Sequence, residues 1–315
     1  MFALKPYLMA FMIVTAANIY DAISFVEQLK EHSKQMMPIQ FDVELTTIVK
    51  PRFNNMEDSL KYWTERMNNS MGRSTNKPPE SEIKAIIDQN ASNFVSSITG
   101  TVYHKCKSFD SNNYLFEVLD GESKERVQAI LSDGKFQYDF NPEMNNLVLM
   151  SPSPYTRELL ELFEHERAYN FIDKGLKMKE KGDDLYLYIS MHGKENYLMK
   201  FKKDNIGFPF EIVHNYDRGY IKYHYSDFKE IDGIKFPTKI TAEQYNYHEV
   251  TNKLYLKLVM IYKFMNITID KNMKKDDIDI VVPPNTRVNN YSDRSVYQLS
   301  SSSEKAVSVK KNIKR

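Results

Sequence analysis

The chain has one cysteine, few glycines and almost no net charge, and each shortage excludes or disfavours a class of protein. Cys106 stands alone, so an internal disulfide framework and a cysteine-based structural zinc site are both excluded. With 10 glycines in 315 residues, a glycine-rich nucleotide-binding fold is disfavoured. Because 43 Lys and Arg balance 42 Asp and Glu, no global field recruits nucleic acid or an anionic membrane. Composition therefore predicts no nucleic-acid partner and no cysteine-held metal.

Aromatic residues, in contrast, are plentiful. The chain holds 21 Tyr and 18 Phe, side chains that suit the pleated surface of a β-sheet. Hydrophobic residues make up 42% of the sequence, and a chain of about 300 residues can bury roughly three quarters of its unfolded surface. These values predict a β-rich globular protein.

The N-terminal segment has the pattern of a secretory signal. Lys5 precedes an apolar run over residues 7–17, which is shorter than the roughly 20 residues that cross a membrane. Val14, Thr15 and Ala16 form a small-residue cleavage site, so residues 1–17 are predicted to be a signal peptide. A buried N-terminal helix is the alternative. The expected mature chain is exported, periplasmic or otherwise extracytoplasmic, without a transmembrane span.

The first two elements after this segment differ in period. Apolar residues recur at helical spacing over about 22–35, and Pro38 stops the predicted helix. Apolar and polar residues then alternate over 39–49, which is typical of a strand with one solvated face.

An excursion over residues 51–96 separates this strand from the rest of the sheet. Residues 51–79 are polar and predict a loop, while apolar residues from Ile83 to Ile98 recur at helical spacing. We therefore expect part loop and part helix, inserted between strands of one sheet.

Short strands and tight turns fill most of the remaining chain. Asp120-Gly121 and Asp133-Gly134 predict hairpins with type I′ turns. A second helix is expected over about 156–174, and strands return over 184–270. Strands joined by hairpins form antiparallel sheets, so the predicted class is α+β. One domain over 18–290 would precede a disordered basic tail over 291–315.

No known catalytic or metal-binding motif is complete. His165 lacks the second histidine of a zinc-protease helix, because Tyr169 occupies that position. His104 and Cys106 share a strand face but are too few for zinc. Ser81 and Lys84 fit Ser-x-x-Lys without its partner motifs. We therefore expect no catalytic residue, no metal and no cofactor. A hydrolase with carboxylates that converge only in space is the less favoured alternative.

Several strands are apolar or aromatic on both faces. The stretches 184–189, 196–201 and 220–225 have this pattern, so both sides of the sheet need cover. Either the chain's own helices and the excursion cover both sides, or one side leaves a cavity that accepts a ligand. The sequence does not say which face would line it.

Three stretches resemble a known family. Residues 131–142 (LSDGKFQYDFNP) and 225–237 (YSDFKEIDGIKFP) resemble two of its hairpins, and residues 278–283 (IDIVVP) resemble its last strand before a proline. The chain is similar to the periplasmic outer-membrane lipoprotein carriers (LolA/LolB-like fold) and to lipoprotein-sorting-type proteins. The resemblance implies an unclosed, strongly curved antiparallel half-barrel whose concave side is covered by helices and, in true carriers, holds lipoprotein acyl chains.

The favoured hypothesis is an exported, cofactor-free binding protein that takes a lipid chain or an acylated protein into an apolar half-barrel. An envelope interaction module with a filled core, bound to another envelope protein, is the alternative. Nine bulky strand residues are the predicted wall of the cavity: Phe136, Tyr138, Tyr186, Tyr188, Tyr197, Met199, Phe201, Tyr223 and Phe236.

Overall fold

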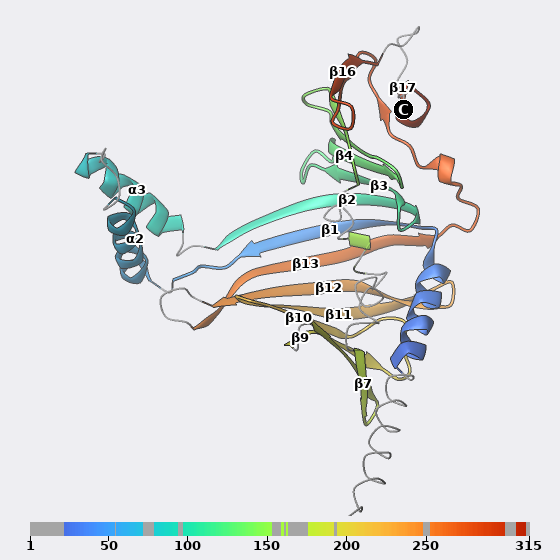
Figure 1. Cartoon of the computed structure of the whole chain (residues 1–315), viewed down its shortest axis with the longest axis horizontal. Coiled ribbons are helices and arrows are strands. Elements are labelled where there is room, and N and C mark those ends of the chain that lie inside the picture. The colour runs from blue at the N-terminus through green and yellow to red at the C-terminus, as the bar shows by residue number, and fades with distance from the viewer. Residues whose placement is uncertain are drawn as a thin grey trace, which may run out of the picture.

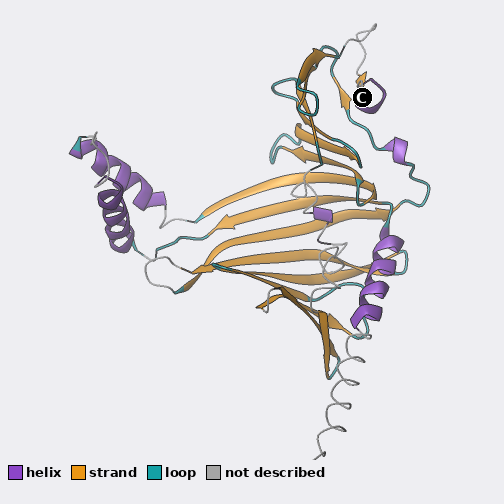
Figure 2. Cartoon of the chain, viewed as in Figure 1, coloured by secondary structure: helices purple, strands orange, loops and turns teal. Residues whose placement is uncertain are grey.

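A computed structural model describes most of the chain. The described residues are 22–53, 55–71, 79–93, 97–152, 159–160, 162, 176–191, 194–247, 253–299 and 307–312. They form one large sheet, a helix on one of its faces, a helical hairpin at one end of the long strands and a C-terminal segment beside one edge of the sheet (Figures 1 and 2).

The sheet has fifteen strands in an open order. From one edge to the other they are β16 (Ser295–Gln298), β15 (Arg287–Asn290), β6 (Asn146–Met150), β5 (Gln137–Asn141), β4 (Arg126–Asp133), β3 (Asn113–Leu119), β2 (Ile98–Asp110), β1 (Ile39–Val49), β13 (Leu254–Ile269), β12 (Ile234–Tyr247), β11 (Gly219–Ile231), β10 (Glu211–Tyr216), β9 (Lys194–Lys202), β8 (Asp184–Met191) and β7 (Leu176–Lys181). All neighbours are antiparallel except β15 and β6. The predicted α+β class with an unclosed antiparallel sheet is confirmed.

The predicted N-terminal helix is present over residues 22–36 and lies across the ends of the long strands that are opposite the helical hairpin (Figure 1). Phe25, Val26 and Leu29 are buried in the contact, and the Phe25 ring meets the edge of the Phe201 ring at a centroid distance of 5.0 Å. We call the face under this helix the helix-side face and the opposite one the outer face.

A second apolar cluster lies on the outer face at the β3–β6 end. Phe116 belongs to the core under the helix, whereas its strand neighbour Leu115 belongs to the second cluster. Successive strand residues point to opposite faces, so the two cores lie on opposite sides of one sheet. The chain after β13 covers the second core: Ile278, Ile280 and Val282 are buried there.

Residues 291–315 were expected to be a disordered tail, and this is wrong for the part that the structure describes. Ser295–Gln298 forms β16, and β17 (Val307–Ser308) pairs with β14 (Val281–Val282). The short helix α6 (Val309–Asn312) follows, and Val307 and Val309 are buried in the second core. Two buried valines in a polar stretch were too weak a pattern to outweigh its serine and lysine content.

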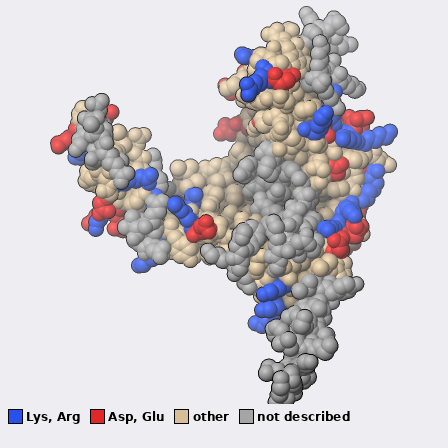
Figure 3. Space-filling model, viewed as in Figure 1, with Lys and Arg blue, Asp and Glu red and all other residues tan. Residues whose placement is uncertain are grey.

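The excursion between β1 and β2 is a helical hairpin that stands away from the sheet (Figure 1). Its second helix, α3 (Glu80–Asn93), was expected, but α2 (Met56–Met71) occupies the segment predicted to be loop. The Asn55 side chain caps α2 by accepting a hydrogen bond from the Asp58 backbone N–H at 2.8 Å. Acidic and basic side chains are mixed over the surface of the hairpin (Figure 3).

The predicted hairpins exist, but their turns differ from the expected type. Six residues join β3 to β4 and three join β4 to β5, so neither is a two-residue type I′ turn. The two-residue turn with both φ angles positive is instead Asp232-Gly233, at 50° and 79°. The second helix, expected over 156–174, lies almost wholly outside the described residues.

Candidate ligand-binding face

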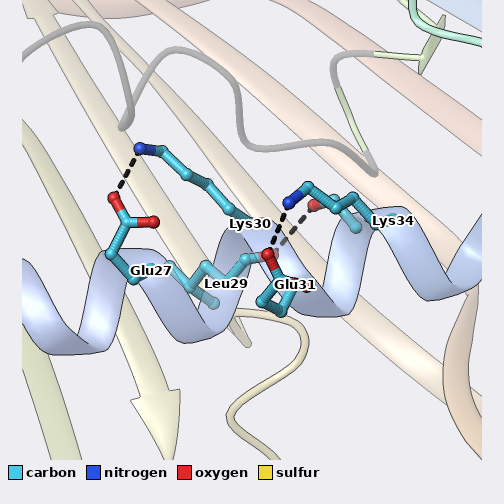
Figure 4. A network of polar contacts seen from close by, with 6 residues as sticks. Glu27, Leu29, Lys30, Glu31 and Lys34 are labelled. Atoms are coloured by element: carbon cyan, nitrogen blue, oxygen red, sulfur yellow. Dashed lines mark hydrogen bonds and ion pairs between the residues drawn. The ribbon is translucent and has the colours of Figure 1, made fainter.

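The apolar residues of the β8–β9 hairpin face the helix. Leu187 and Ile189 of β8 are buried, as are Met199 and Phe201 of β9, and all four belong to the core under the helix. The helix itself is amphipathic: Lys30 pairs with Glu27 at 2.6 Å and Lys34 with Glu31 at 2.5 Å on its solvent side (Figure 4). This part of the helix-side face is closed by the chain's own side chains.

Farther along the long strands, the same face becomes exposed while staying apolar. Val49 lies opposite Ile98 on β2, and Leu45 lies opposite Val102. Val49 is 41% exposed, Ile98 58% and Val102 38%. On the other side of β1, β13 contributes two partly exposed residues to the same face. We call this surface the open strip: Leu45, Val49, Ile98, Val102, Leu258 and Met260.

The open strip is continuous with the core and is not a separate patch. Leu45 and Met260 are half-buried and pack against the core under the helix. Ile221 and Tyr223 of β11 do the same on the far side of β12. A hydrocarbon laid along the strip would therefore extend an existing apolar layer.

The outer face of the same strands carries ion pairs beside a few apolar residues such as Ile48 and Val259. Glu44 accepts a hydrogen bond from Lys263 at 2.6 Å and another from the Tyr103 hydroxyl at 3.2 Å. Glu211 pairs with Lys200 and, at 2.9 Å, with Lys222. We therefore expect a hydrocarbon on the helix-side face, where no charged side chain interrupts the open strip.

Burial raises the pKa of Glu211, but the hydrogen bonds and charges of Lys200 and Lys222 outweigh it and hold the pKa below the ordinary 4.5. A depressed carboxyl pKa adds stability above the unfolded-state value, and this contribution is lost as the pH falls through the folded-state value. We expect Glu211→Gln to lower the free energy of unfolding at pH 7. The difference from the wild type should shrink below about pH 4.5. Urea unfolding across this range measures it, and a constant difference would contradict the assignment.

The histidines on the helix-side face are placed for packing. His104 lies opposite Val43 on β1, two residues from Cys106, and both side chains share this face as predicted. Burial lowers the pKa of His104, and its buried Nε2 has no hydrogen-bond partner in the described structure. The His214 ring stacks on Tyr197 at 4.0 Å. Among the described residues no group of three metal-binding side chains converges. Glu164, His165 and Tyr169 lie outside the described residues.

The nine predicted wall residues do not share one face. Five lie on the helix-side face: Tyr197, Met199, Phe201, Tyr223 and Phe236. Tyr186 and Tyr188 lie on the outer face, where their rings stack at 6.4 Å. Tyr138 is buried in the second core and Phe136 packs against it. The nine candidates therefore cannot all line one cavity, because strands with two apolar faces contribute to both sides, and a ligand contact at the five on the helix-side face stays a prediction.

Two surface pockets among the described residues lie elsewhere. One of about 470 Å³ is lined by Phe208, Phe210 and Phe228, with Lys202 and Lys235 at its rim. Another of about 320 Å³ lies between β1, β2 and β13 beside Asp42 and Lys105. Neither includes a predicted wall residue.

Sequence reasoning missed Ile98 and Val102 of the open strip. Ile98 was counted as the last residue of a helical repeat, yet it begins β2. The alternation Ile98, Gly100, Val102, His104, Cys106 on one face was the pattern that could have found them.

The described residues thus define an α+β protein with an open antiparallel sheet, a helix packed on it and an apolar strip beside the helix. No family model and no curated protein matches the sequence. Among the described residues, no helix is long and apolar enough to cross a membrane.

Three solved structures are similar to the chain. A LolA superfamily protein from Nitrosomonas europaea shares 13% identity at a TM-score of 0.43, over 80% of this chain and 96% of that one. A DUF1329 family protein from Desulfovibrio piger shares 11% at 0.43, over 80% and 96%. A domain described as an outer membrane lipoprotein-sorting protein, from Vibrio parahaemolyticus, shares 9% at 0.42, over 83% and 97%. Such values concern the fold at most, so function has to be inferred from this chain's own residues.

Proposed function

We propose that this protein is an exported carrier that holds the hydrocarbon chain of a lipid or acylated protein on the helix-side face. The observation that supports the proposal is the open strip, where Val49, Ile98 and Val102 extend the core into solvent. Apolar surface that continues a core and remains exposed is typical of binding sites. The ligand would lie on the strip, where Leu45 and Met260 join the core under the helix and Tyr223 lies two strands away on the same face.

The expected binding is reversible. Burying about a dozen methylenes yields roughly 10 kcal/mol at about 0.8 kcal/mol each. Association costs roughly 4 to 15 kcal/mol in lost freedom. A chain held on an open strip therefore exchanges readily, as a carrier requires, and no covalent chemistry is needed.

Val102→Glu tests the proposal. A carboxylate in the middle of the strip would have to lose its hydration beneath a bound chain, which costs at least about 1–3 kcal/mol. We expect at least about tenfold weaker binding of a fluorescent long-chain fatty acid, measured by titration. Val127→Glu is the matched control, because Val127 is 45% exposed on β4 and lies outside the strip.

If Val102→Glu and Val127→Glu bound the fatty acid with equal affinity, the open strip would not be the binding site. Wild-type protein that binds no fatty acid, and carries no acyl species when extracted from its native envelope, would favour the interaction module. The packed core under the helix is the observation in favour of that module.

A further inference from the structure

The edge strand β7 presents three lysines on one face. Leu176 is buried in the core and Met178 packs against it, so these two residues point to the helix side. Lys177, Lys179 and Lys181 alternate with them and are exposed. Because alternate residues of a strand share a face, the three ammonium groups line the outer face of the sheet edge.

No described carboxylate pairs with these lysines. They lie opposite Tyr188, Tyr186 and Asp184 of β8, in that order. Asp184 is already bonded to Lys202 at 2.5 Å. The Lys179 ammonium lies 5.3 Å from the centre of the Tyr188 ring, a cation–π contact that leaves its charge in place.

The positive charge continues into the sheet. Lys200 and Lys202 of β9 occupy the same face, where the strand carboxylates from β7 to β10 are Asp184 and Glu211. Asp183 of the β7–β8 turn also lies near Lys202, so five lysines stand against three carboxylates in this part of the sheet. Figure 3 shows Lys and Arg side chains gathered at the end of the sheet that holds β7. A chain with a net charge of only +1 therefore has a strongly basic edge.

We propose that this basic edge, defined by Lys177, Lys179, Lys181, Tyr186 and Tyr188, docks on the surface of an anionic lipid bilayer. Each lysine near such a surface contributes about 1 kcal/mol through attraction to anionic headgroups. Tyrosine rings suit the boundary between headgroups and acyl chains. Choosing a membrane over an acidic protein rests on the proposed function, since a carrier of hydrocarbon must meet a bilayer. The docking edge lies on the face opposite the open strip, so contact with the bilayer leaves the strip free.

The test is co-sedimentation of the full chain with phosphatidylcholine vesicles, with and without phosphatidylglycerol. We compare the wild type with Lys177→Gln/Lys179→Gln/Lys181→Gln. The loss of three charges should weaken binding to the anionic vesicles by about a hundredfold. Binding should also weaken as salt is added. Arginine at the same three positions should retain wild-type binding.

A control of equal charge change is Lys105→Gln/Lys107→Gln/Lys229→Gln, which alters exposed strand lysines away from β7. It should bind within about threefold of the wild type, because the electrostatic attraction is local. Equal losses in the two triple variants would mean that only net charge matters and would overturn the proposal. So would binding that does not depend on phosphatidylglycerol, which would leave the lysines as protection of the edge against strand pairing.

Fatty-acid titration of the same preparations separates this proposal from the proposed function. A β7 variant that binds fatty acid normally and vesicles poorly supports both. If anionic vesicles bind the wild type but not the β7 variant, while no preparation binds fatty acid, the docking edge stands and the carrier function fails. If fatty acid binds but the β7 variant sediments as the wild type does, the docking edge fails.

Discussion

Phe201→Ala is expected to lower the free energy of unfolding by about 3–5 kcal/mol. Phe201 is fully buried on the helix-side face of β9, and its ring meets Phe25 of the packed helix at 5.0 Å. The substitution removes the aromatic contact and leaves a cavity between helix and sheet that the surrounding backbone fills only in part. Urea unfolding followed by far-UV circular dichroism measures the change as a shift in midpoint at constant slope.

Tyr186→Ala is the matched control for this experiment. Tyr186 lies on the adjacent strand but on the outer face, half-exposed and stacked on Tyr188. Its loss should cost no more than about 1.5 kcal/mol, the value of an aromatic pair. Equal costs for Tyr186 and Phe201 would mean that the helix does not dock on the face assigned to it. If the Phe25 and Phe201 rings are in contact, the effect of the double variant Phe25→Ala/Phe201→Ala on the free energy of unfolding should differ from the sum of the two single effects by at least about 0.5 kcal/mol.

Strands and hairpins were predictable because their signals are local. The alternation over 39–49 and the turn residues around 232–233 each specify an element without reference to the rest of the chain. Strand pairing was not predictable in this way, because it joins segments that are distant in the sequence. β1 lies between β2 and β13, and the β13 partner comes from the opposite end of the chain. The open order of the sheet was therefore accessible only through the resemblance to a known family.

The faces of the sheet were not predictable, because β8 and β9 are apolar or aromatic on both sides. Burial separates Leu187 from Tyr188 in the structure, but hydrophobicity does not separate them in the sequence. In the folded chain an ion pair determines which face each β9 residue takes. Lys200 points to the outer face, where it pairs with Glu211, so Met199 points to the helix-side face. Nothing local to β9 indicates this, since Glu211 belongs to another strand.

Helix α2 was missed because its composition is polar, although its start was encoded. Asn55 and Asp58 form a capping pair, with the Asn55 amide donating to the Asp58 carboxylate at 3.0 Å. The helix is then stabilised by aromatic and cationic contacts. The Arg52 guanidinium lies 4.4 Å from the centre of the Tyr62 ring, and Arg66 donates to the Tyr62 hydroxyl at 2.8 Å. The capping pattern at Asn55 would have predicted this helix better than hydrophobic content did.

Val309→Asp is expected to lower the free energy of unfolding by about 4 kcal/mol, because the substitution combines the loss of a buried side chain with the burial of a polar one. Val309 is fully buried in the second core, where it packs with Ile280 and Val282 of the segment that covers the outer face. A disordered tail, as the composition of 291–315 suggested, would tolerate the change at almost no cost. Thermal and urea unfolding of the full chain measure the difference.

Val281→Asp is the control, since Val281 lies on the paired strand β14 but is 51% exposed. It should cost less than about 1 kcal/mol, within the range of surface substitutions. If both variants were neutral, Val309 and the short helix α6 that it begins would contribute nothing to the second core. A large cost for Val309 alone means that the C-terminal segment with β17 and α6 is part of the folded domain. Among the described residues, the helix then covers one part of the helix-side face and the C-terminal segment covers the outer face at β3–β6, and the open strip is an exposed apolar part of the helix-side face.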